Sequence, residues 1–300
     1  MDNIYDVIII GAGPAGLSAA LYAKRGNLKT LIIEKSTPGG TLVSISHLYN
    51  YPGYNGVDGA TLAFTMYEQV TNLNVDFAFE EVIEVKLENE LKIVKTNVNE
   101  YVSKNIIVAT GTTYQNLKVA NERKFIGKGI SYCAVCDGKL FTNKNIATIG
   151  SSDHALKETI YLSQFANKIY MLIDNDISSS IYYQELMKTN KVELISNAKI
   201  TKLIGEDVLD GIEIKIDDEK SILNVSGVFP LIGSLPSNSF LSSFPIFASS
   251  GYMKVDNNYE SEIKGIFGAG DVVDKTLRQV VTATNDGAIA AQYIATNRKR

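Results

Sequence analysis

The chain has 300 residues, of which 45% are hydrophobic and 21% charged, and its formal net charge is −4. This length suits two domains of ordinary size, and the composition is typical of a soluble globular protein rather than a disordered one. The net negative charge gives no reason to expect nucleic-acid binding. No apolar run approaches the length needed to span a membrane, and residues 1–6 do not resemble a signal peptide, so we expect a cytoplasmic protein.

A dinucleotide-binding pattern occupies the first part of the chain. Residues 7–10 form a β-branched run that predicts a strand buried in a parallel sheet. The run leads into GAGPAG at 11–16, then apolar residues at helical spacing, then a second strand at 30–33 that ends at Glu34. Strand, glycine loop, helix, strand and acid together are the Rossmann pattern, in which glycines admit a pyrophosphate and the acid binds a ribose. A tight turn without a ligand is the alternative, and the flanking elements disfavour it.

Three further stretches in this region are candidates for contact with the same ligand. Gly39-Gly40-Thr41-Leu42 is a second glycine loop. The predicted turn at 49–53 contains Asn50, a candidate polar contact to a ring system, although the aromatic residues of this turn could belong to a core. Residues 105–111 predict a buried strand ending in the small residues Ala109-Thr110-Gly111, where the backbone can lie against a cofactor.

The chain contains two cysteines, Cys133 and Cys136, followed at once by Asp137. A structural zinc site needs four ligands, and only His47 and His154 could be added, so we expect no metal. A structural disulfide over so short a loop would restrain little of the unfolded chain, and two unconnected thiols are the third alternative. We favour a redox pair, which stores two electrons and releases them by thiol exchange.

A second Rossmann-like pattern begins at residues 146–150, but its phosphate loop is degenerate. The loop reads GSSDHA at 150–155, with Ser152 where the pattern requires glycine. After the next strand, residues 174–180 carry two acids and no base, whereas an NADP site would carry an arginine for the 2′-phosphate. This pattern disfavours NADPH. It leaves either a domain that has lost its nucleotide or an NADH site with Asp174 on the ribose.

The last part of the chain returns to the first pattern. Residues 265–272 predict a short strand that delivers Asp271, which could bind a ribityl or ribose hydroxyl. Arg278-Gln279-Val280 opens a helix, whose N-terminus would stabilise negative charge on a reduced flavin. Alone, Asp271 would be interpreted as a turn or cap acid, and together with the first glycine motif we expect it to bind a cofactor.

These motifs, with GAGDV at 268–272, ATG at 109–111 and CAVCDG at 133–138, resemble the low-molecular-weight thioredoxin reductase family of flavoproteins over nearly the whole chain. The resemblance implies an α/β fold of two Rossmann-like, three-layer domains, the pyridine-nucleotide-type domain being inserted into the FAD domain. The FAD domain would be 1–114 plus 241–300, and the inserted domain 115–240. The resemblance further implies tight non-covalent FAD, thioredoxin as the substrate and a homodimer.

The resemblance also assigns roles to residues. Cys136 would face the flavin, Cys133 would exchange with the partner disulfide, and Asp137 would protonate the departing thiolate. The two domains would rotate about connections near 112–116 and 240–246. The implied FAD contacts are Gly11, Gly13, Pro14, Ala15, Gly16, Glu34, Gly39, Gly40, Thr41, Leu42, Asn50, Val82, Ala109, Thr110, Gly111, Gly270, Asp271, Arg278, Gln279 and Val280.

The departures at 150–155 and 173–180 look like the ferredoxin-dependent branch of this family, so we expect reduced ferredoxin as the electron donor. An NAD(P)H-dependent thioredoxin-disulfide reductase is the alternative, and a redox-sensing flavoprotein without turnover is the second alternative. Basic side chains could steer an acidic ferredoxin, although ordinary solvated surface is an equal explanation for either cluster. The clusters are Lys118, Arg123, Lys124 and Lys128, with Glu122 as the one acid among them, and Arg298-Lys299-Arg300.

Overall fold

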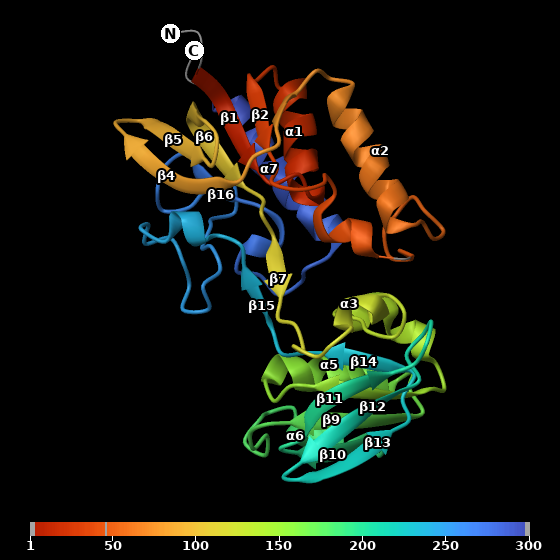
Figure 1. The fold of residues 1–300 in the computed structure, drawn as a ribbon. Coiled ribbons are helices and arrows are strands. Elements are labelled where there is room, and N and C mark those ends of the chain that lie inside the picture. The colour runs from red at the N-terminus through yellow and green to blue at the C-terminus, as the bar shows by residue number, and fades with distance from the viewer. Residues whose placement is uncertain (1–3, 46, 298–300) are drawn as a thin grey trace. The chain divides into compact units, whose positions relative to one another are not determined.

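The computed structural model describes residues 4–45 and 47–297, so the basic cluster at 298–300 lies outside the described residues. The chain divides into two compact units (Figure 1). The first unit combines Met1–Thr113 with Leu235–Arg300, and the second is Tyr114–Ser234. Each unit is built around its own sheet, which is mixed in the first unit and parallel in the second.

The first unit has a seven-stranded sheet in the order β3-β2-β1-β6-β5-β4, with β16 also paired to β6. The strands β1, β2, β3, β6 and β16 run parallel, and β4 and β5 join antiparallel. The strand bounds are β1 Ile4–Ile10, β2 Thr30–Ile33, β3 Asp76–Ala78, β4 Val82–Glu88, β5 Leu91–Thr96, β6 Glu100–Val108 and β16 Ile266–Gly268. Because β6 pairs first with β5 and then with β16, the carboxy-terminal segment returns to the sheet that the amino-terminal segment began.

The alternation of side chains along β1 shows why this sheet is covered on both faces. Val7 and Ile9 pack into one core cluster, and Ile8 and Ile10 pack into a second one on the other face. Helices α1 (Pro14–Arg25) and α7 (Val280–Thr296) contribute to the first cluster and contact each other (Figure 1). Helix α2 (Gly59–Thr71) packs beside α1.

The second unit has three layers around the parallel sheet β10-β9-β8-β14. The antiparallel sheet β11-β12-β13 contributes to the core cluster on one face, and helix α5 (Asp153–Ser163) contributes to the cluster on the other. The strands are β8 Asn145–Ile149, β9 Lys168–Ile173, β10 Val192–Ser196, β11 Lys199–Ile204, β12 Gly211–Ile216, β13 Glu219–Leu223 and β14 Gly227–Pro230. Short helices α3 (Glu122–Phe125), α4 (Ala134–Asp137) and α6 (Tyr183–Lys188) complete the unit.

The chain crosses between the units at two short strands, β7 (Thr112–Tyr114) and β15 (Ser234–Pro236), which pair with each other. The second crossing therefore precedes the expected boundary at 240/241. The reason is that residues after the crossing, such as Leu241 and Ile246, are buried in a core cluster of the first unit.

The close packing of α1 against α7 depends on a glycine. A Cβ at Gly287 of α7 would lie 2.0 Å from the backbone oxygen of Ala15 in α1. We expect Gly287→Ala to lower the free energy of unfolding by about 1–3 kcal/mol, because the helices must move apart. Chemical denaturation measures this effect. Gln292→Ala, an exposed change on the same helix, is the control, and equal stability of the two variants would contradict the packing argument.

Candidate functional site

The GAGPAG loop connects β1 to α1 and has little room for side chains on one side and open space on the other. Gly11 has φ +102°, and a Cβ there would lie 2.6 Å from the backbone oxygen of Ala109. A Cβ at Gly16 would lie 1.9 Å from the oxygen of Gly11. At Gly13, the N-cap of α1, a Cβ would meet no atom within 4 Å, and no side chain caps the helix. The open side of this helix N-terminus fits an anionic pyrophosphate.

Two neighbouring segments adjoin the loop, as the sequence predicts. The amide of Gly39 donates to the oxygen of Ala12 (2.7 Å), and a Cβ at Gly40 would approach the Cα of Gly13 at 3.3 Å. Glu34, directly after β2, accepts hydrogen bonds from the amides of Ala12 (2.7 Å) and Ser36 (2.8 Å). The acid therefore lies beside the glycine loop, where it can reach a ribose.

Thr110 and Asp271 carry buried oxygens without a hydrogen-bond partner in the described part of the chain, namely Thr110 Oγ1 and Asp271 Oδ1. Burial raises the pKa of Asp271, and the charges of Lys275 and Arg278 oppose that rise. An unpaired buried polar atom is costly to a folded protein unless a ligand pairs it. Hydroxyl groups of a ribityl chain would supply such partners, so these residues fit FAD.

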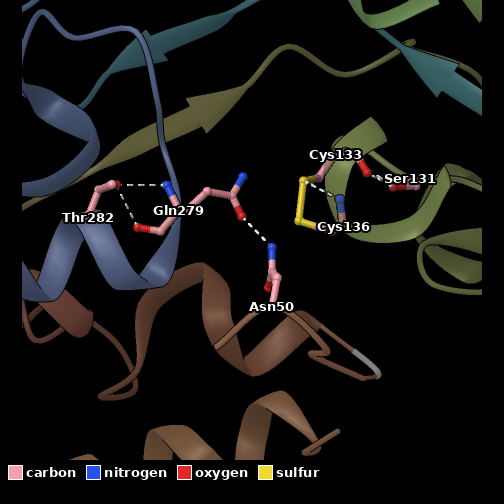
Figure 2. The surroundings of a disulfide bond; sticks show 6 residues. All are labelled: Asn50, Ser131, Cys133, Cys136, Gln279 and Thr282. Atoms are coloured by element: carbon pink, nitrogen blue, oxygen red, sulfur yellow. Dashed lines mark hydrogen bonds between the residues drawn. A yellow bond between two sulfur atoms is a disulfide. The ribbon is translucent and has the colours of Figure 1, made fainter. Parts of the chain in front are cut away.

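Asn50 and Gln279 lie far apart in the sequence and meet in the first unit. The side-chain amide of Asn50 donates to the side-chain oxygen of Gln279 at 2.8 Å (Figure 2). Gln279 is the N-cap of α7, and its backbone amide donates a hydrogen bond to the hydroxyl of Thr282 (3.1 Å). The structure thus brings a predicted polar contact to the start of the predicted helix.

Other predicted contacts are arranged around these loops. Gly270 has φ +78°, and a Cβ there would lie 2.8 Å from the Cβ of Ala15, so the GAGD turn lies against the start of α1. Arg278 donates to the backbone oxygens of Asp271 and Val273 and stacks on Tyr252. The buried side chain of Leu42 packs into a small core cluster, and the half-buried Val82 packs against the core on one face of the main sheet.

One residue of this region was missed by the sequence analysis. Asp286 of α7 is 1% exposed, pairs with Lys275 (2.6 Å) and accepts from the amide of Gly270 (3.0 Å). This pair holds the GAGD turn against α7. The only signal in the sequence was an acid inside an otherwise uncharged helical run.

In the second unit, Cys133 and Cys136 form a disulfide with a Cα–Cα distance of 5.3 Å. Cys133 is the N-cap of α4, and its sulfur accepts a hydrogen bond from the backbone amide of Cys136 at 3.1 Å (Figure 2). The amide of Cys133 donates to the hydroxyl of Ser131 (3.1 Å). An amide donor stabilises a thiolate over a thiol, so after reduction Cys133 has the environment of a nucleophile.

Asp137 follows the disulfide and is half-buried. Burial raises the pKa of Asp137, and a hydrogen bond from Ser131 partly opposes the rise. The carboxyl group therefore keeps its proton to a higher pH than an exposed aspartate does, which suits a proton donor.

Glu122 has a structural role that the sequence analysis did not anticipate. Instead of balancing the basic side chains around it, it is buried, accepts from the amide of Leu117 (2.9 Å) and accepts from the hydroxyl of Tyr132. Burial, and then this hydrogen bond, raise the pKa of Tyr132 well above its usual range. Tyr132 also stacks on Tyr114, with ring centroids 5.0 Å apart, so the residue next to Cys133 is firmly anchored.

The described residues provide neither a metal site nor a membrane-spanning helix. No three His, Cys, Asp or Glu side chains in that part of the chain gather as a metal site requires. None of its helices combines the length and apolarity needed to cross a membrane.

Comparisons with known proteins agree with this geometry. A model of the pyridine nucleotide-disulphide oxidoreductase family matches residues 5–287. The chain belongs to this family. It is 40% identical over 298 residues to the thioredoxin reductase of Ureaplasma parvum, covering 97% of this chain and 96% of that protein. It is 38% identical over 298 residues to the Bacillus subtilis thioredoxin reductase, covering 98% and 94%.

The solved structures include a similar fold over the full length. The crystal structure of thioredoxin reductase from Streptococcus pyogenes superposes with a TM-score of 0.94 at 35% identity, covering 99% of this chain and 98% of that one. The predicted α/β fold class with two Rossmann-like domains is confirmed, as is the low-molecular-weight thioredoxin reductase family. The ferredoxin-dependent branch is not supported by these comparisons, which favour the NAD(P)H-dependent alternative because the family is named for a pyridine nucleotide.

The unpaired oxygen of Thr110 predicts opposite effects of its removal on the stability of the flavin-free protein and on the affinity for FAD. Thr110→Val removes a buried hydroxyl that lacks a partner, so we expect the flavin-free protein to keep or gain stability. We expect the dissociation constant of FAD to rise about tenfold, because one hydrogen bond to the ligand is lost. Thermal unfolding of flavin-free protein and a flavin-fluorescence titration measure the two effects.

The control is Thr148→Val in the second unit, where the hydroxyl is buried but bonded to Thr159 at 3.1 Å. That change should lower stability and leave FAD affinity unchanged. A Thr110 variant that behaves like the Thr148 variant would contradict the assignment.

Proposed function

We propose that this chain is an FAD-dependent thioredoxin reductase that acts through the Cys133–Cys136 pair. The observation that carries the proposal is the disulfide at α4, with an amide aimed at the sulfur of Cys133 and a carboxyl of raised pKa at Asp137. Thioredoxin as the substrate is supported by the names of the relatives from Ureaplasma parvum and Bacillus subtilis.

FAD would be held in the first unit by the groups already described. The N-terminus of α1 at Gly13 would take the pyrophosphate, Glu34 a ribose, and Thr110 and Asp271 the hydroxyls of the ribityl chain. Bound FAD supplies the step between the electron donor and the disulfide, because a flavin can take up two electrons and pass them on.

The thiol chemistry follows from the environments of the two sulfurs. Two electrons and two protons convert the disulfide to a dithiol. The Cys133 thiolate then attacks one sulfur of the thioredoxin disulfide, which forms a mixed disulfide and releases a thiolate that Asp137 protonates. The Cys136 thiol loses its proton and attacks Cys133, which re-forms the internal disulfide and expels the second thioredoxin sulfur as a thiolate that takes up a proton, giving reduced thioredoxin.

For the electron donor, we propose a pyridine nucleotide, on the evidence of the family match. Reduced ferredoxin is the second candidate, and one observation favours it. Because Glu122 is buried, Lys118, Arg123, Lys124 and Lys128 are exposed without the one acid that lies among them in the sequence. Such a cluster can steer an acidic protein. Anaerobic mixing of the holoprotein with each donor separates the candidates by the rate of flavin bleaching.

Substitution of each cysteine by serine should have a different effect. Cys133→Ser should abolish thioredoxin reduction while flavin reduction by the donor continues. Cys136→Ser should still attack thioredoxin but accumulate the mixed disulfide, since the resolving thiol is missing. Stopped-flow absorbance and non-reducing electrophoresis measure these outcomes. Normal thioredoxin turnover by the Cys133 variant would refute the proposal, and loss of turnover with every donor by the unmodified protein would favour a redox sensor.

The raised pKa of Asp137 predicts a pH dependence. The group donates its proton only below its pKa, so the rate of thiol exchange should fall as pH rises through that raised value. Asp137→Asn should slow exchange about 100-fold and remove this fall. Ser131→Ala deletes the hydrogen bond that lowers the pKa of Asp137, so the fall should move to higher pH. A fall at unchanged pH in the Ser131 variant would contradict the assignment.

A further inference from the structure

The chain contains two Rossmann-type loops, at 11–16 and 150–155, and the second shares several structural features with the first. In each unit a glycine with positive φ directly follows the first strand, Gly11 after β1 and Gly150 after β8. In each unit an acid directly follows the second strand, Glu34 after β2 and Asp174 after β9. The amide of each glycine donates to a backbone oxygen of the second strand, at 2.8 Å for Gly11 and 3.0 Å for Gly150.

The contact between acid and loop is also repeated. Glu34 accepts from the amide of Ala12, the residue after the first glycine, and Asp174 accepts from the hydroxyl of Ser151, the residue after the second glycine, at 2.5 Å. The side chain of Asn175 also donates to Asp174, and both bonds end on Oδ1. The second carboxylate oxygen, Oδ2, is therefore the one placed for a ribose hydroxyl.

The loops differ at the helix N-terminus. Gly13 leaves α1 uncapped, and α1 has no acid in its first turn. In the second unit, Ser152 occupies the N-cap of α5 and its hydroxyl accepts from the amide of Ala155 at 3.2 Å. Asp153 adds a negative charge to the first turn of α5 and is tied to Ser180 (2.6 Å). This end of the helix attracts anions less than the corresponding end of α1.

The segment after β9 adds a further negative charge, that of Asp176, to that of Asp153. Asp176 is exposed and accepts from the amide (2.9 Å) and the hydroxyl (2.8 Å) of Ser178. The hydrogen bond from the backbone amide of Ser178, and to a lesser extent that from its hydroxyl, lower the pKa of Asp176, so this carboxyl is ionised at neutral pH. Of the cations near this segment in the sequence, Lys157 stacks on Tyr182 and Lys168 pairs with Glu193 at 2.6 Å, whereas Lys188 at the end of α6 is exposed.

From this arrangement we infer that the second unit accepts a dinucleotide whose adenosine ribose is unphosphorylated, NADH, and rejects NADPH. Asp174 takes the ribose hydroxyl, and the negative charges of Asp174 and Asp176 together repel a 2′-phosphate. The inference rests on the proposed function only for the role of the nucleotide as reductant, because the binding preference itself is a property of the second unit.

Binding of fragments tests the preference without any turnover. The flavin-loaded protein, in which the first unit is filled, is titrated with ADP-ribose and with 2′-phospho-ADP-ribose in a calorimeter. We expect ADP-ribose to bind at least about tenfold more tightly, which corresponds to about 1.4 kcal/mol. Equal or tighter binding of the phosphorylated fragment would overturn the inference, and so would failure of both fragments to bind at millimolar concentrations.

A charge reversal sharpens the test. Asp176→Arg should lower the preference for ADP-ribose about tenfold or reverse it, because a guanidinium can pair with the 2′-phosphate. Asp207→Arg makes the same change of charge at an exposed acid far along the chain from the loop and should leave the preference unchanged. Equal shifts in both variants would show that only net charge matters and would overturn the assignment to this segment.

Failure of the inference is distinguishable from failure of the proposed function. The holoprotein is reduced with dithionite and mixed with oxidised thioredoxin, which bypasses the nucleotide. Reduction of thioredoxin there, combined with no preference for ADP-ribose, would overturn only the inference. No reduction of thioredoxin, combined with the expected preference, would overturn only the proposed function.

Discussion

The hydrogen bond from the amide of Cys136 to the sulfur of Cys133 makes the two cysteines chemically different. Two sulfurs in a disulfide are equivalent by composition, and only their surroundings can decide which one attacks a partner after reduction. Here the helical turn of α4 aims an amide at one sulfur, and Ser131 holds the preceding backbone in place. Asp137, whose pKa is raised by burial, is suited to the proposed role of proton donor.

The second unit, which carries the two cysteines, repeats the Rossmann arrangement of the first unit but has more negative charge around its loop. Both units keep the glycine with positive φ after the first strand and the acid after the second. The first unit leaves its helix N-terminus open at Gly13, whereas the second fills the corresponding position with Ser152 and adds Asp153 and Asp176 nearby. Under the two proposals made above, one architecture would hold a flavin dinucleotide in the first unit and select among nicotinamide dinucleotides in the second.

Short-range patterns made most of the fold predictable. The run at 7–10 and the loop at 11–16 identify a strand, a turn and a helix within a few residues, because glycine is the residue that tolerates the approach of Gly11 to Ala109. The hydrogen bond between Asn50 and Gln279 was not predicted, since nothing local in the sequence links residues so far apart. The buried pair Lys275–Asp286 and the burial of Glu122 were missed because a charged residue in a sequence is ordinarily exposed. The second crossing at β15 was placed too late, because the packing of Leu241 against the first unit is a tertiary effect.

The claim that Cys133 is the attacking sulfur is tested most directly by identifying the cysteine that forms the mixed disulfide with thioredoxin. Reduced holoprotein is mixed with oxidised thioredoxin, quenched in acid within milliseconds, alkylated and mapped by mass spectrometry. A mixed disulfide at Cys133 with Cys136 alkylated is the expected result, since the amide hydrogen bond favours the Cys133 thiolate. A mixed disulfide at Cys136, or the absence of any covalent adduct while thioredoxin is reduced, would contradict it.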